Sequence, residues 1–382
     1  LGSGADLPDC IETLNVDSPE LARNVHRLYH DAGAQWGIAN TFGATANRLA
    51  GHHAQDRAGE LNRAGVEVAD EIYHGRVLGD VGPCGLGTGF YGTNTFDRVV
   101  SEYASQIDVL IDAGAHALLV ETMIDITDAR AAAIAARETL ARRGISMPVL
   151  VTCSFDESGR MPLSGTTPEA AAVALEAVGA DGVGMNCGLD SAHLFPLMER
   201  MAGSTKLPLA VQPNAGHPTT DANGAISYQE TPEEAAAWAR KFHEIGVQVI
   251  GSCCGTTPAF TAALSGALSD EPVPARACPA FPALSSARER FEVKGDVLPP
   301  VDDFDLSGYA DDEADRLESD LLMQAALASE PLCVSGIASP LLERALRVYP
   351  GRALVMMAPN SRSDERAQVT KIAARYGALL RD

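Results

Sequence analysis

The sequence predicts an α/β protein built on a (βα)8 TIM-like barrel, with a smaller α/β piece after it. Short apolar runs alternate with alanine-rich helical stretches over about 270 residues. The runs are apolar throughout rather than at every second position, which is typical of parallel strands buried on both faces. They recur at the spacing of a βα unit, about 30 residues or more. Such a series fits a barrel of this kind.

The predicted strands lie at residues 36–39, 76–81, 116–120, 148–152, 182–185, 208–212 and 247–251. Helices are expected between them at residues 19–32, 95–113, 128–143, 167–178 and 231–245. Some of these helices begin at a Ser-Pro or Thr-Pro pair, where the hydroxyl caps the helix and proline occupies its first turn. A barrel of eight needs one more strand, which we expect before Leu1; the chain begins with this leucine and not with methionine.

A doubly wound dinucleotide-binding sheet is the competing architecture. Its signature is G-x-G-x-x-G between an early strand and a helix. Residues 85–90 come nearest to this motif, but Phe90 stands where the third glycine is required, and no helix follows at once. The motif is therefore rejected, and the barrel is preferred.

The amino-acid composition changes after Asp270, and we divide the chain into three parts. Residues 1–270 form the barrel, residues 271–320 a linker that is first proline-rich and then acidic, and residues 321–382 a partial α/β piece. Residues 296–320 hold ten acidic residues and one basic residue, which is typical of a solvated connector. From Glu313, inside this stretch, we expect helices at 313–327, 340–348 and 363–376, with strands at 332–337 and 353–357.

Composition limits the classes of function. Hydrophobic residues make up 46% of the 382, enough for a sizeable core, so wholesale disorder is excluded. The formal net charge of −22 repels phosphate and argues against nucleic acid or an anionic membrane as partner. No apolar run has the length of a membrane span and no signal peptide opens the chain, so we expect a cytoplasmic protein. The eight cysteines are then expected as free thiols or metal ligands.

Three cysteines stand where barrel enzymes carry their active sites, after the carboxyl ends of strands. Cys187 follows the fifth predicted strand, and Cys253 and Cys254 follow the seventh. Adjacent side chains on a strand point to opposite faces, but Gly251 and Gly255 permit a bend that brings both cysteines to one point. Three thiolates with one open position are a catalytic zinc pattern. On the residues alone, buried hydrophobic cysteines or a vicinal disulfide remain as alternatives.

A series of motifs follows one another along the chain. They are Pro19-Glu20 with His26-Arg27, Asn40-Thr41-Phe42-Gly43-Ala44, Gly79-Asp80-Val81-Gly82-Pro83, Glu121-Thr122-Met123, Ser164-Gly165-Thr166, Met185-Asn186-Cys187-Gly188, Gln212-Pro213-Asn214-Ala215-Gly216 and Ser252-Cys253-Cys254-Gly255-Thr256. In this order they resemble the homocysteine S-methyltransferase family, which includes the zinc barrel of cobalamin-dependent methionine synthase. The resemblance runs from about Asp9 to Leu268, some two thirds of the chain, and the two cysteine motifs are its most specific part.

The resemblance implies that Cys187, Cys253 and Cys254 ligate Zn²⁺ and that the sulfur of homocysteine takes the open position. A free thiol has a pKa of about 8.5, so little of it is thiolate at neutral pH. Binding to zinc removes the proton and leaves a nucleophilic sulfur. The expected reaction is in-line attack of this sulfur on a methyl donor, which gives methionine.

The resemblance also implies residues that contact homocysteine. Glu121 is the expected partner of the substrate ammonium, and Asn214 is expected close to the metal. Asn40 and Asn186 are expected to line the pocket, with a role as turn formers as the alternative. Two polar residues complete the candidates: Ser154 and Thr166.

Two histidines, His26 and His30, lie four residues apart on a predicted helix and could pair on a metal. That helix lies well before a strand end, so we interpret both as surface residues.

The chain departs from the family at both ends. The family's opening Asp-Gly-x-Met-Gly-Thr segment, at the end of the first barrel strand, would lie before Leu1. Residues 331–378 resemble the interior of the pterin-binding module of methionine synthases, but Ser335-Gly336 and Met356-Met357 replace its pterin-facing aspartate and asparagine. We therefore do not expect this piece to bind folate.

Two functions follow as candidates. The first is a zinc-dependent homocysteine S-methyltransferase that takes its methyl group from a corrinoid on a separate protein, S-methylmethionine, betaine or S-adenosylmethionine. The tail resembling methionine synthase favours the corrinoid protein. The alternative is a non-catalytic zinc- or thiol-binding scaffold within a methyltransferase assembly. A phosphate-binding barrel is less favoured, because it would need a glycine-rich loop where Cys253 and Cys254 stand.

Overall fold

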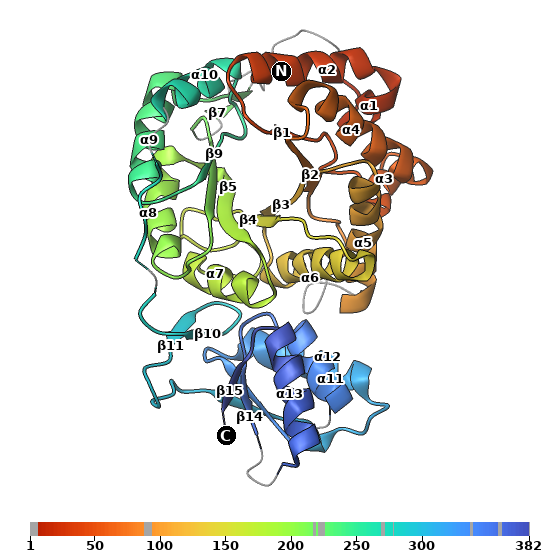
Figure 1. Cartoon of the computed structure of the whole chain (residues 1–382), viewed down its shortest axis with the longest axis vertical. Helices are drawn as coiled ribbons and strands as arrows, with labels where there is room; N and C mark the ends of the chain where they lie inside the picture. The colour runs from red at the N-terminus through yellow and green to blue at the C-terminus, as the bar shows by residue number, and fades with distance from the viewer. Residues whose placement is uncertain are drawn as a thin grey trace.

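The computed structural model describes residues 7–87, 94–216, 219–220, 226–268, 272–277, 279–336, 339–357 and 361–381. Within them, a curled parallel sheet of seven strands is surrounded by helices (Figure 1). Its strands stand in chain order: β1 (Gly37–Ile38), β2 (Val77–Val81), β3 (Ala117–Met123), β4 (Val149–Cys153), β5 (Gly182–Asp190), β6 (Leu209–Asn214) and β9 (Val249–Ile250). The seven predicted strands are confirmed, and the arrangement is that of a TIM-like barrel.

The sheet is open between its two edge strands, β1 and β9. Among the described strands, β1 pairs only with β2, and β9 pairs only with β6. The described part of the barrel therefore has seven strands in place of the eight that close a (βα)8 sheet.

Five helices agree with the predicted ranges: α2 (Pro19–Asp31), α5 (Phe96–Asp112), α6 (Ile126–Arg143), α7 (Pro168–Ala177) and α9 (Pro232–Glu244). The prediction omitted α1 (Leu14–Asp17), α3 (Ala46–Ala50), α4 (Ala58–Tyr73), α8 (Ser191–Ala202) and α10 (Pro258–Ala267). The start signal is weak at α4, which begins after Arg57 without a side-chain cap, and α8 contains Pro196. The other signals were overlooked: Thr45 caps α3, Asp190 caps α8, and α10 begins at the pair Thr257-Pro258. In the described ranges, no helix combines the length and the apolar surface that a bilayer span requires.

Barrel strands turn alternate side chains outward and inward. On β2, Val77 and Val81 pack in the main hydrophobic core, and Gly79 faces Leu110 of α5. The side chain of Asp80 therefore points into the barrel. The same alternation turns a set of polar residues inward at the carboxyl ends of β3, β5 and β6: Glu121, Asn186, Gln212 and Asn214.

The C-terminal unit is a second parallel sheet, ordered β12 (Asp302–Asp305), β13 (Leu332–Ser335), β14 (Leu354–Met356) and β15 (Leu379–Arg381). Its helices are α11 (Ala314–Leu327), α12 (Ser339–Val348) and α13 (Ser363–Arg375), which agree with the predicted ranges. Two short antiparallel pairs lie outside both sheets: β7 (Thr219–Thr220) with β8 (Ile226–Ser227), and β10 (Ala283–Ser285) with β11 (Arg290–Glu292).

The acidic stretch 296–320 departs from its expected role as a solvated connector. It contains β12 and the first half of α11. Phe304 is buried in β12 between exposed or half-exposed acidic residues, and Leu306 and Leu317 are fully buried. A few apolar residues at the right spacing are enough to dock a strand and a helix, but the surrounding charges mask this pattern in the sequence.

The C-terminal unit packs directly on the barrel. One hydrophobic core extends through both parts, and the unit lies beside α6 and α7 (Figure 1). Arg344 and Arg347 of α12 both form ion pairs with Asp97 of α5. Arg130 of α6 is fully buried and donates a hydrogen bond of 3.1 Å to the carbonyl oxygen of Leu346. The two units are therefore joined by packing as well as by the chain.

The expected surface position holds only in part for His26 of α2, which is half-buried. Its ring packs edge-on against Tyr73 of α4, with centroids 5.9 Å apart, and burial lowers its pKa to about 4. Below a pH of about 6.5, the unfolded chain takes up a proton that the folded chain excludes. The free energy of unfolding is therefore expected to fall by about 2 kcal/mol as the pH drops from 6.5 to 4.

Urea denaturation across this pH range measures the effect. His26→Gln is expected to remove this part of the pH dependence. His30→Gln is the matched control, because His30 contacts the same Tyr73 ring at 5.4 Å but its side chain is 48% exposed. An unchanged pH profile in His26→Gln would contradict the assignment.

Candidate metal centre

Three cysteine thiols meet at the carboxyl ends of β5 and β9. The Sγ atom of Cys254 lies 3.8 Å from that of Cys187 and 4.0 Å from that of Cys253. Among the described residues, these three are the only group of potential metal ligands within 4.8 Å of one another. Zn–S bonds of about 2.3 Å in a tetrahedron place sulfur atoms about 3.8 Å apart. The thiols therefore fit a zinc ion with a fourth position open.

The loop after β9 is fastened to the end of β6. The N–H of Cys253 donates to the carbonyl oxygen of Pro213 at 2.7 Å, and the N–H of Ala215 donates to that of Cys254 at 2.9 Å. Asn214 completes the contact, because its Oδ1 accepts the N–H of Cys254 at 3.1 Å. Asn214 thus lies next to the thiols, where it holds the loop that carries two of them.

Left-handed backbone positions shape the two turns that carry the thiols. Gly255 has a φ of +79°, and a Cβ atom there would lie 2.2 Å from the ring of Tyr228, so only glycine fits. Cys187 has a φ of +59°, which is uncommon for a residue with a Cβ atom. Such a conformation persists only where the surroundings hold it.

Asn186 stabilises the turn of Cys187 through hydrogen bonds to residues of β3 and β4. It is completely buried, and its Oδ1 accepts the N–H of Thr122 at 3.1 Å and the hydroxyl of Thr152 at 2.9 Å. Its Nδ2 donates to Oγ1 of Thr122 at 2.7 Å and lies 4.0 Å from the Sγ of Cys253. Asn186 therefore connects β3, β4 and β5 directly beneath the thiols.

Glu121 lies inside the barrel near the same cluster. Gln212 donates a hydrogen bond of 3.2 Å to its Oε1. Burial, together with repulsion from Cys187, raises the pKa of Glu121 to about 7. A cationic group placed beside this carboxyl would be stabilised by it.

The three thiols shift one another's pKa values. Hydrogen bonds from Cys253 and Cys254 hold the pKa of Cys187 well below its ordinary value. The same contacts raise the pKa values of Cys253 and Cys254. Without a cation the cluster therefore favours a single thiolate, and a divalent metal is what would hold all three deprotonated.

Two other predicted residues are engaged elsewhere. Asn40 donates to Oδ1 of Asn15 at 2.9 Å and so fastens the N-terminal segment to the end of β1. Thr166 donates to the carbonyl oxygen of Ala287 at 2.6 Å and holds the β10–β11 hairpin. Ser154 is buried just after β4.

Sequence reasoning missed Asp80 and Gln212 as residues of the barrel interior. Both belong to motifs that carry the family resemblance, but a motif does not show which way a side chain points. Strand alternation counted back from the core-facing Val81 could have indicated that Asp80 faces inward.

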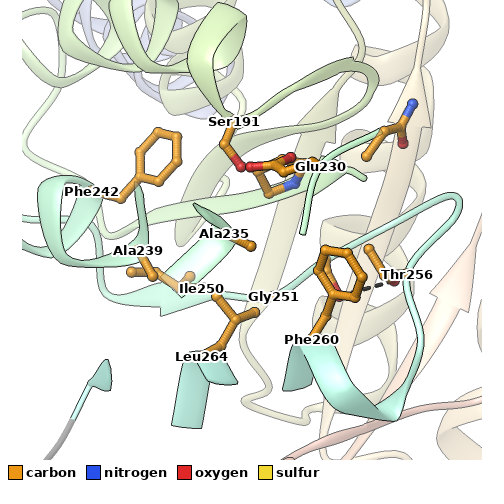
Figure 2. A pocket seen from close by; sticks show the side chains of 13 residues that line it. Ser191, Glu230, Ala235, Ala239, Phe242, Ile250, Gly251, Thr256, Phe260 and Leu264 are labelled. Atoms are coloured by element: carbon orange, nitrogen blue, oxygen red, sulfur yellow. Dashed lines mark hydrogen bonds between the residues drawn. The ribbon is translucent and has the colours of Figure 1, made fainter. Parts of the chain in front are cut away.

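Figure 2 shows a small cavity beside the loop that follows β9. Asn214 and Ser252 are among the residues that line it. Its volume is about 10 Å³, room for about one water molecule. Apolar side chains form much of its wall: Ala235, Ala239, Phe242, Phe260 and Leu264. It is too small for an amino acid.

Comparison with known sequences connects this site to one family. The family model for homocysteine S-methyltransferase matches residues 4–268. Methionine synthase from Mycobacterium tuberculosis (strain ATCC 25618 / H37Rv) is 33% identical over 289 residues, which cover 73% of this chain and 24% of that protein. Methionine synthase from Mycobacterium leprae (strain TN) is 34% identical over 260 residues, 66% of this chain and 21% of that protein. The match thus spans about a quarter of the length of these relatives.

Solved structures agree with the sequence comparison. The metallated form of the homocysteine methyltransferase MmuM from Escherichia coli matches with a TM-score of 0.57 at 26% identity, covering 69% of this chain and 90% of that one. The oxidized form matches with a TM-score of 0.54 at 27% identity and the same coverage. The family model covers well over half of the chain, and the fold agrees with it. The chain belongs to the homocysteine S-methyltransferase family.

Proposed function

We propose that this chain is a zinc-dependent methyltransferase that methylates the sulfur of homocysteine and releases methionine. The observation that carries the proposal is the convergence of Cys187, Cys253 and Cys254 at the spacing of zinc ligands, with a fourth position open. Family membership and the names of the relatives support homocysteine as the substrate. The free thiols also need a reducing compartment, which supports a cytoplasmic location.

The chain's own residues would divide the work as follows. Zinc held by the three thiolates would supply the positive charge that keeps a substrate thiol deprotonated at neutral pH. Glu121 would accept the substrate ammonium and so orient the amino acid in the barrel. Asn214 and Asn186 hold the two turns that present the thiols and would thereby keep the metal position fixed relative to the substrate.

The methyl donor is proposed to be a methyl-corrinoid carried on a separate protein. The relatives that support this choice are methionine synthases, and the chain matches only a part of their length. S-Methylmethionine, betaine and S-adenosylmethionine are the small-molecule alternatives.

The test is methionine formation by the purified, zinc-loaded full chain with homocysteine and each donor in turn. Methionine is expected with one donor, and none is expected when homocysteine or the donor is omitted. Zinc-loaded protein that forms no methionine with any of the four donors would favour the alternative of a non-catalytic zinc- or thiol-binding scaffold.

A further inference from the structure

Asp80 is a carboxyl group buried inside the barrel that the proposed mechanism does not use. Its side chain is only 3% exposed, and in the described part of the chain its Oδ1 has no hydrogen-bond partner. The backbone N–H of Val81 donates to the Asp80 carboxyl group, but a buried carboxyl oxygen such as Oδ1 is costly without a donor of its own, so Oδ1 remains able to accept a hydrogen bond from a bound ligand.

The strand register places Asp80 on the same side as Glu121. Asp80 of β2 is aligned with Leu119 of β3, and Glu121 follows two residues later on that strand. Val81 and Val120 point the opposite way, toward the helices, and pack in the main hydrophobic core. Asp80 and Glu121 therefore both face the barrel interior from neighbouring strands, with Glu121 one step nearer the thiols.

The Glu121 carboxyl affects the protonation of Asp80 electrostatically. Burial raises the pKa of Asp80 well above its ordinary value, and the Glu121 carboxyl raises it further. Among the described residues, no lysine, arginine or histidine forms an ion pair with either group. In the described part of the barrel, Asp80 and Glu121 are thus two inward carboxyls without a paired cation.

We propose that Asp80 is a second recognition residue for the substrate ammonium and, with Glu121, selects thiols that carry an α-amino group. An ammonium group has three N–H donors, and one carboxyl oxygen of Glu121 already accepts from Gln212. Oδ1 of Asp80 is a further acceptor for these donors. The inference rests on the proposed function, because it takes homocysteine as the ligand.

The test compares two ligands that differ only in the amino group: homocysteine and 4-mercaptobutanoate. Their affinities for the zinc-loaded full chain are measured by calorimetry, in the wild type and in Asp80→Asn, which keeps the size of the side chain. The variant is expected to bind homocysteine about 10 to 100 times more weakly, because a charge-assisted hydrogen bond is lost. Its affinity for 4-mercaptobutanoate is expected to stay within about twofold of the wild type.

Asp80→Ser serves as a second variant in case the asparagine disturbs folding, with the same selective loss expected. Zinc content is measured in parallel and is expected to be unchanged. An equal loss of affinity for both ligands would show that Asp80 only supports the fold, and no loss for either would show that it does not contact the ammonium; each result overturns the inference. Failure of the wild type itself to bind homocysteine would overturn the proposed function and this inference together.

Discussion

Cys254→Ser is expected to lose about nine tenths or more of the zinc that the wild type binds, and methionine formation with it. The Sγ of Cys254 lies within 4.0 Å of both other thiols, and the described residues offer no other ligand group at this place. A serine hydroxyl stays protonated at neutral pH and is a harder donor than a thiolate, so it does not replace the cysteine. Elemental analysis of the dialysed protein, next to a methionine assay, measures both effects.

Cys333→Ala is the matched control for this experiment. Cys333 is a buried thiol of β13 in the C-terminal unit and is 4% exposed. Its removal is expected to leave the zinc content unchanged. Full zinc content in Cys254→Ser would sink the metal assignment, and equal zinc loss from both variants would mean that the effect is one of folding rather than ligation.

The sequence predicts the barrel well because its strands carry a strong local signal. Continuous apolar runs mark parallel strands buried on both faces, and each of the seven lies where it was expected. The thiols were predictable for a related reason: side chains that follow the carboxyl ends of parallel strands gather at one end of a barrel, even when another strand, here β6, lies between them. Cys187 and Cys254 are far apart in the chain, yet their sulfur atoms are 3.8 Å apart.

What the sequence could not provide depends on contacts between distant residues. The direction of Asp80 follows from a register that no motif states, and the burial of His26 depends on Tyr73 of another helix. Asn40 was expected to line the pocket because of the family resemblance, and no motif indicates the hydrogen bond between its amide and Asn15 of the N-terminal segment. The ordered structure of the acidic stretch 296–320 was missed for the opposite reason. Its charges dominate the composition, although a few buried residues such as Phe304 decide its structure.

Asn186→Ala is expected to lower both stability and zinc affinity. The variant loses three hydrogen bonds of a completely buried amide and leaves the hydroxyl of Thr152 without this partner, which together cost about 2 to 4 kcal/mol of unfolding free energy. Thr122, held by Asn186 through two of these bonds, has a φ of +57°, a strained value for a β-branched residue. Without the Asn186 side chain, Thr122 and the turn at Cys187 are expected to relax toward unstrained backbone conformations. This would move the thiol of Cys187 away from the metal position. Zinc affinity should fall about 10- to 100-fold, as for other residues that orient metal ligands.

Asn62→Ala separates the loss of stability from the loss of metal. Asn62 of α4 is also a buried asparagine with three hydrogen bonds: its Nδ2 donates to carbonyl oxygens at 2.7 Å and 2.8 Å, and its Oδ1 accepts from Gln106 at 3.0 Å. α4 packs against β1 and β2, whereas the thiols follow β5 and β9. Asn62→Ala should therefore lose a similar unfolding free energy in urea and keep the wild-type zinc affinity in a competition titration with a chelator. If both variants lost zinc affinity equally, Asn186 would act only through global stability. If neither did, the left-handed turn of Cys187 would be stable without Asn186, and the site would be held by the loop contacts of Asn214 alone.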